Sequence, residues 1–262
     1  FKAADASLRF VLLTGVTKFS QITVFSGFNQ PNDISMDSRY DAICGITEEE
    51  LYSVFGEAIV EMANKFDYTV DEMKSLLKKQ YDGYHFSNAL LDIYNPFSII
   101  NAFNKMDIDN YWYKSGTPTY LVKLLEGHHV NMQKLTSRPY ESQYFVDYRA
   151  DAENPLAMLY QSGYLTIKGY DRRYSEYTLD YPNVEVRKVF VALMANSYLK
   201  KDESEAAYWI VNLDRMLRCG ELDEVRDAFT AFLASIPYEA NKDERAKDFE
   251  THFQYTFYII FR

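Results

Sequence analysis

The sequence predicts an α/β segment at its N-terminal end, followed by a mainly α-helical region that contains a winged-helix-like module. Three observations support this fold class. Residues 10–13 (FVLL) form an unbroken apolar run, which is typical of a strand buried on both faces of a parallel sheet. Two T-x-x-E capping boxes then precede apolar residues at helical spacing. Further along, a short helix, a glycine and two strand-like runs follow one another, which is the order of a winged helix.

The first strand-like run ends at Thr14-Gly15, where the chain must turn. In open α/β sheets ligands bind at the carboxyl ends of the strands, so Thr14 and the nearby Lys18 are candidate site residues. The spacing alone equally fits a simple strand end followed by a solvated lysine. Residues 1–7 resemble the last turn of a helix, so the strand has almost nothing before it. We therefore expect residues 1–46 to be part of a larger domain, and the chain to be a fragment.

Two capping boxes predict the first two long helices. Thr47 with Glu50 begins a helix over 47–65, and Thr69 with Glu72 begins another. In each box the threonine side chain accepts a hydrogen bond from the backbone of the glutamate, which in turn accepts one from the threonine backbone.

A turn and two further helix starts follow. Gly83 in YDGYHFS predicts a positive φ or a close backbone approach. Asn95 is predicted to cap a helix that has Pro96 at its first position, and Thr117-Pro118 repeats this arrangement. We expect 47–130 to form one small helical domain.

The winged-helix-like module is expected over 131–200. The stretch 131–149 has mixed signals and suggests strand or loop. A helix over 155–162 ends at Gly163, and strands over 164–168 and 176–180 are joined by a polar turn at 169–173. Arg172 and Arg173 in that turn are the candidate contacts to the phosphates of DNA.

Asn183 is predicted to cap a helix from 184 to about 199. The next region, 201–248, is expected to be a helical connector with helices over roughly 203–218 and 221–235, and a last helix covers 241–262.

Composition and charge restrict the class of protein. The net charge of -10 is opposite to what a duplex DNA surface requires, so any DNA contact must be local or come from another domain. No apolar run reaches the length of a membrane span and no signal peptide is present, so we expect no membrane association. The 2 cysteines form no CxxC pair, which indicates a reducing, cytoplasmic location.

Several catalytic motifs are missing from the sequence. No glycine is followed by lysine, so there is no P-loop, and no strand ends in an acidic pair for Mg²⁺. The adjacent His128 and His129 cannot easily share a metal, so no metal site is expected. The letters Glu72-Met73-Lys74 match the E-x-K of nucleases but fall on a predicted helix, whereas that motif functions on a strand.

Six stretches resemble the bacterial AAA-ATPase-like family over about residues 1–187: LTGVTKFS, FSGFNQPNDIS, CGITEEEL, YDGYHFS, YNPFS and SGTPTYLV. Members of that family combine a P-loop ATPase with a C-terminal restriction-endonuclease-like (PD-D/E-XK) nuclease. The resemblance implies that 1–46 is the C-terminal part of the ATPase α/β core, a remnant of its sheet, and that 47–130 is its helical subdomain.

The resemblance also implies roles for single residues. Thr14 would be the polar sensor that faces the γ-phosphate, with Lys18 near the same edge. Tyr94, Asn95 and Pro96 would lie against the adenine, although a helix start without a ligand fits the same residues. The polar residues of YDGYHFS would either orient a nucleotide or lock a turn between domains.

Residues 249–262 resemble the first helix of the family's nuclease domain, truncated. Glu250 stands where a glutamate often assists metal binding in that superfamily. An amphipathic packing helix fits the same spacing.

We therefore expect a part of an ATPase coupled to a nuclease, itself catalytically incomplete. ATP and Mg²⁺ would be bound by the full-length protein and neither by this fragment, whose exposed surfaces could self-associate. The alternatives are a nucleotide-independent module that binds DNA or a protein partner, and a structural domain that regulates its neighbour.

Overall fold

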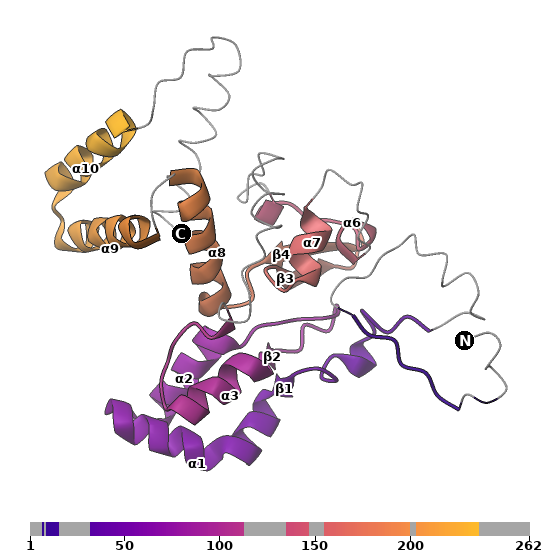
Figure 1. Cartoon of the computed structure of the whole chain (residues 1–262). Helices are drawn as coiled ribbons and strands as arrows, with labels where there is room; N and C mark the ends of the chain where they lie inside the picture. Colours follow the sequence, from indigo (N-terminus) through magenta and orange to yellow (C-terminus); the bar gives the residue numbers. More distant parts are fainter. Residues whose placement is uncertain are drawn as a thin grey trace, which may run out of the picture.

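The computed structural model describes residues 7, 9–15, 32–112, 135–146, 155–199 and 203–235. Figure 1 shows three groups of elements: a unit of three helices at the bottom, a hairpin unit beside it, and a run of three helices that leads away from both.

The helical unit consists of α1 (Glu48–Phe66), α2 (Val70–Tyr81) and α3 (Pro96–Lys105). Both capping boxes are confirmed. The Thr47 side chain accepts from the Glu50 backbone N–H at 3.3 Å, and the Glu50 carboxylate accepts from the Thr47 N–H at 2.9 Å. The corresponding distances at Thr69 and Glu72 are 3.2 and 2.8 Å.

The helix start at Asn95 is also confirmed. Asn95 Oδ1 accepts from the backbone N–H groups of Phe97 and Ser98 at 3.0 and 3.4 Å, and Pro96 takes the first helical position. Just before it, β2 (Ile93–Tyr94) pairs antiparallel with β1 (Ile46–Thr47), which joins the start of α3 to the start of α1. The predicted start at Thr117-Pro118 lies outside the described residues.

The hairpin unit contains α6 (Gln143–Val146), α7 (Leu156–Gln161), β3 (Thr166–Asp171) and β4 (Glu176–Asp180). The bounds of β4 are as predicted. The predicted turn at 169–173 is wrong, because β3 continues to Asp171 and the turn covers 172–175. A register shift between Ile167 and Gly169 accommodates the glycine, so the ladder continues beyond it.

The stretch predicted as strand or loop contains both α6 and a short pairing. Tyr140 and Tyr177 exchange two backbone hydrogen bonds of 2.8 Å, which add one residue pair to the open edge of β4.

Three helices complete the described chain: α8 (Val184–Leu199), α9 (Glu203–Cys219) and α10 (Leu222–Ser235). Their existence and approximate bounds are as predicted, and Asn183 Oδ1 caps α8 by accepting from the Val186 N–H at 3.0 Å. In Figure 1, α8 rises from the helical unit, and α9 and α10 follow it outward. The predicted helix over 241–262 lies outside the described residues.

The hydrophobic core has two parts. One lies among α1, α2 and α3, where Leu51, Ile59 and Met62 are inaccessible to solvent. The other packs the hairpin against α7 and the first turns of α8, with Ile167, Leu179 and Phe190 in its interior. The order of helix, hairpin and helix matches the prediction, while the assignment as a winged helix stays a prediction.

The N-terminal prediction of a buried strand is wrong for this structure. Residues 10–13 form no strand, and their side chains are exposed by 80, 41, 54 and 47% in turn. An apolar run becomes a buried strand only where neighbouring strands pair with it. In the described ranges the strands form two two-stranded antiparallel sheets, and neither lies along this run. Assignment of residues 1–46 to a P-loop ATPase sheet stays a prediction.

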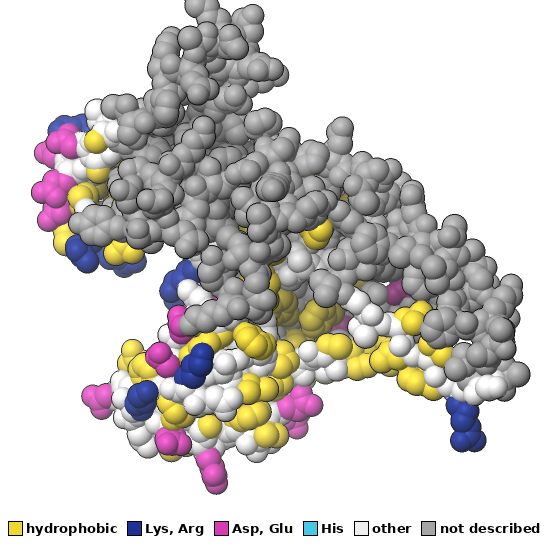
Figure 2. Space-filling model, viewed as in Figure 1, with side chains coloured by type: hydrophobic (Ala, Val, Ile, Leu, Met, Phe, Trp, Pro, Cys, Tyr) yellow, Lys and Arg dark blue, Asp and Glu magenta, His cyan; other side chains and the backbone are white. Residues whose placement is uncertain are grey.

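The described surface carries hydrophobic side chains between charged ones. Figure 2 shows them over the unit formed by α1, α2 and α3, where Val54, Phe97 and Ile100 are exposed. Of the helices that the structure describes, none has the length and apolarity needed to cross a membrane.

Candidate functional site

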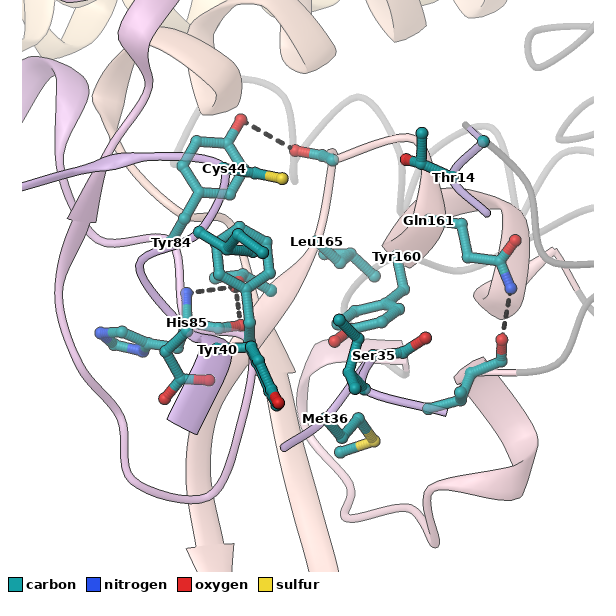
Figure 3. Close-up of a pocket in the computed structure, with 18 of the residues that line it drawn as sticks. Thr14, Ser35, Met36, Tyr40, Cys44, Tyr84, His85, Tyr160, Gln161 and Leu165 are labelled. Carbon is teal, nitrogen blue, oxygen red and sulfur yellow. Dashed lines mark hydrogen bonds between the residues drawn. The ribbon is translucent and has the colours of Figure 1, made fainter. Parts of the chain in front are cut away.

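A cavity of about 550 Å³ lies where the segment 34–44, the hairpin unit and the N-terminal segment meet. Thr14 lines this cavity together with His85 and Thr166, so a predicted site residue lies at the same cavity as the YDGYHFS motif. In Figure 3, Thr14 lies beside Gln161 on one side, and His85 lies on the opposite side.

Asp41 is the buried acid of the cavity lining. Asp41 is the residue directly after the 3₁₀ helix η3 (Ser38–Tyr40), and it is only 4% exposed. Ser87 Oγ donates to Asp41 Oδ2 at 2.6 Å, and the Ala89 N–H donates to Ser87 Oγ at 3.1 Å. Asp41 Oδ1 accepts no hydrogen bond from the described residues.

Gly83 allows the chain to pass close to the start of α8. Its φ is +95°, and a Cβ placed on it would lie 2.5 Å from the Pro182 carbonyl oxygen. Lys168 Nζ donates to the carbonyl oxygens of Gly83 and Pro182 at 2.6 and 2.9 Å. The predicted positive φ and close backbone approach of Gly83 are therefore both confirmed.

The next two residues of YDGYHFS join the helical unit to the hairpin unit. Tyr84 pairs with Ile93 through two backbone hydrogen bonds, and its hydroxyl donates to the Gly163 carbonyl at 3.2 Å. The His85 backbone N–H donates to Thr166 Oγ1 at 2.8 Å, and Thr166 Oγ1 donates to the His85 carbonyl at 2.9 Å. These contacts favour the turn-locking interpretation of the motif.

The imidazole of His85 faces two acceptors. Nδ1 lies 2.6 Å from the Ile167 carbonyl oxygen, and Nε2 lies 2.7 Å from Asp92 Oδ1. Since a carbonyl oxygen only accepts, Nδ1 carries a proton. Both ring nitrogens are therefore engaged within the protein.

A charged network continues from Asp92 across the helical unit. Lys78 Nζ lies 3.3 Å from Asp92 Oδ2 and 3.1 Å from Glu48 Oε1. The hydrogen bond to Glu48 raises the pKa of Lys78. Burial acts to raise the pKa of Asp92, but the hydrogen bonds from His85 and Lys78 outweigh it and hold that pKa below its ordinary value.

Asp82 lies at the edge of this network and is 2% exposed. Lys78 is 3.8 Å from its Oδ2. Burial raises the pKa of Asp82 to about 6, because the low-dielectric surroundings disfavour the charged carboxylate more than the Gly83 backbone N–H and Lys78 together stabilise it.

The three residues expected at the adenine are not among the residues that line the cavity. Tyr94 is inaccessible to solvent in the core of the helical unit, and burial raises the pKa of its hydroxyl. The Asn95 amide is engaged in capping α3 and Pro96 starts that helix. The cavity thus brings Thr14 to YDGYHFS rather than to YNPFS, and the adenine role of these residues stays a prediction.

The remaining predicted residues divide into two groups. Arg172 and Arg173 are exposed in the hairpin turn, where the Arg173 guanidinium lies 5.5 Å from the centre of the Tyr174 ring. Lys18 and Glu250 lie outside the described residues. Among the described residues, no group of three histidines, cysteines, aspartates or glutamates is arranged to hold a metal ion.

Sequence reasoning missed Asp41 and Glu185. Glu185 is inaccessible to solvent, its Oε1 accepts from the Trp112 backbone N–H at 2.7 Å, and burial raises its pKa. Both acids lie in stretches with ordinary polar composition, so no local pattern distinguishes them from surface carboxylates. The one sequence feature that leads to Asp41 is Ser87, the last residue of the YDGYHFS motif. Ser87 is buried, and its hydroxyl donates a hydrogen bond to Asp41.

Comparison with known proteins gives one similar sequence, the "uncharacterized protein in vnfD 5'region" of Azotobacter chroococcum mcd 1. It is 32% identical over 262 residues, which cover 99% of this chain and 48% of that protein. The chain therefore spans about half the length of the curated relative that it matches. No family model matches the chain. No solved structure matches it.

Proposed function

We propose that this chain contributes the sensor, helical and winged-helix-like parts of an ATP hydrolase that is coupled to a restriction-endonuclease-like nuclease. One observation carries the proposal: Thr14 and YDGYHFS, which belong to separate stretches of the family resemblance, line a single cavity. Two motifs that are 67 or more residues apart in sequence have no local reason to meet. A shared functional site would explain why they meet.

The cavity does not itself fit a triphosphate. The described residues that line it include no lysine or arginine, and they include the buried carboxylate of Asp41. Phosphate groups in proteins are held by backbone N–H groups, cationic side chains and Mg²⁺. The proposal therefore requires that the phosphate-binding loop and the Mg²⁺ ligands come from outside this segment, and that this chain by itself is catalytically incomplete.

The test uses the longer polypeptide, of a length comparable with the relative, and the variant Thr14→Ala. We expect ATP hydrolysis to slow by about tenfold or more, as for loss of one hydrogen bond made during reaction, with a much smaller change in ATP affinity. Thr178→Ala, at an exposed threonine of β4, is the matched control and should change neither quantity. Equal losses of affinity and rate, or no loss at all, would contradict the role of Thr14.

A second candidate function is a nucleotide-independent interaction module, and the observation that favours it is the hairpin turn. Arg172 and Arg173 both lie exposed there, next to Tyr174, which is 62% exposed. Two cations and an aromatic ring at a loop tip form a small surface that suits phosphate groups or a protein partner. The net charge of -10 opposes tight binding of duplex DNA by the chain as a whole.

A further inference from the structure

The interior of the cavity is mainly apolar and aromatic. Tyr40 comes from η3, Tyr84 and Phe86 from the YDGYHFS motif, and Tyr160 from α7. Figure 3 shows the Tyr160 ring between Leu165 and the segment that carries Ser35 and Met36. A cavity of about 550 Å³ with aromatic walls and few polar groups has the size and lining of a small-molecule site.

The described lining of the cavity contains a carboxylate but no lysine or arginine to balance it. Asp41 is 4% exposed, Ser87 occupies its Oδ2, and its Oδ1 accepts no hydrogen bond from the part of the chain that the structure describes. No lysine or arginine is among the described lining residues. His85 also lines the cavity, but its ring nitrogens face the Ile167 carbonyl and Asp92.

A buried carboxylate without a cation is costly to maintain in a folded protein. A ligand that brings a positive charge with N–H donors would offset this cost at Asp41 Oδ1, through a charge-assisted hydrogen bond. Aromatic rings around the same space also favour a cation, because the faces of the rings carry partial negative charge.

We propose that the cavity is a binding site for a small aromatic cation, with the ring of the ligand among Tyr40, Tyr84 and Tyr160 and its cationic group on Asp41. Anionic ligands are disfavoured by the same carboxylate, so the cavity interior would not hold the phosphates of ATP, in line with the requirement above that the phosphate-binding loop comes from outside this segment. The proposal concerns the cavity of this chain alone, and its test involves no ATP hydrolysis.

Three isosteric probes test the charge preference: benzamidine, benzamide and benzoate, which are cationic, neutral and anionic versions of one shape. Binding to the 262-residue chain is measured by calorimetry and by ligand-observed NMR. We expect benzamidine to bind saturably and at least tenfold more tightly than benzamide, and benzoate not to bind. Equal affinities for benzamidine and benzamide, or no binding of benzamidine at millimolar concentration, would overturn the proposal.

Two variants then locate the site. Asp41→Asn keeps an acceptor for Ser87 but removes the charge, so benzamidine should lose its advantage over benzamide. Tyr40→Ala removes a rim side chain that is 37% exposed, and should weaken both ligands, benzamidine somewhat more because the cation also loses the face of one ring. The matched control is Asp67→Asn, at an exposed position with φ of 58°, where asparagine is well tolerated. Unchanged selectivity in a folded Asp41→Asn variant would also overturn the proposal. If that variant does not fold, the wild-type selectivity and the Tyr40→Ala result decide.

Discussion

Replacing Asp82 with asparagine should stabilise the protein at neutral pH. Asp82 is 2% exposed, and burial raises its pKa from 3.8 to about 6. The folded state therefore holds the proton of Asp82 more tightly than the unfolded chain does. At neutral pH the carboxylate must be buried in its charged form, and this burial opposes folding. Asparagine occupies nearly the same volume without a charge.

The size of the effect follows from the two pKa values. A difference of one in pKa corresponds to about 1.4 kcal/mol, so a rise from 3.8 to about 6 corresponds to about 3 kcal/mol of lost stability at pH 7. The sign follows from the protonation of each state. Below the unfolded pKa both states are protonated and the penalty is absent. It grows as the pH rises through the interval between the two pKa values and is complete above about 6.

The assay is urea unfolding of the wild type, Asp82→Asn and the control Asp67→Asn between pH 4 and pH 8. We expect the free energy of unfolding of Asp82→Asn to exceed that of the wild type by about 3 kcal/mol at pH 7, and by less than about 1 kcal/mol at pH 4. The control makes the same chemical change at an exposed position, so it shows the effect of the substitution without burial. A difference between Asp82→Asn and wild type that does not change with pH, or a variant that is less stable at pH 7, would refute the reasoning.

Three further predictions concern the backbone, DNA and catalysis. Gly83→Ala should cost about 2 kcal/mol or more in urea unfolding, because φ is +95° and the added Cβ meets a carbonyl oxygen at 2.5 Å. Gly56→Ala, a helical glycine of α1 with open space around it, should instead gain up to about 1 kcal/mol, and equal effects would contradict this account. The chain should bind duplex DNA weakly in fluorescence anisotropy at physiological salt, and reversing the charge of Arg172 and Arg173 should abolish the remaining binding; submicromolar binding that survives the reversal would refute both statements. With Mg²⁺ or Mn²⁺ the purified chain should neither hydrolyse ATP nor cut plasmid DNA, and turnover above a blank would show that the segment contains more of the machinery than we infer.

The local structure of the helical unit was determined by the sequence. Thr47 with Glu50, Thr69 with Glu72, and Asn95 with the two N–H groups after Pro96 are pairs no more than three residues apart. Hydrogen bonds of that range depend on one turn of backbone, so the same residues form them whatever surrounds the helix. The positive φ of Gly83 belongs to the same class, because only glycine adopts it without strain.

Burial and the cavity were decided by the tertiary structure. The run at residues 10–13 reads as a buried strand, but its burial depends on strands that would have to lie beside it. Asp41 and Ser87 are 46 residues apart, and Thr14 and Tyr160 come from distant parts of the chain. Their meeting depends on how α7, η3 and the YDGYHFS turn pack together, and no periodicity in the sequence encodes that packing. In a sequence a buried aspartate cannot be told from an exposed one, because its burial arises only when distant parts of the chain pack around it and exclude water.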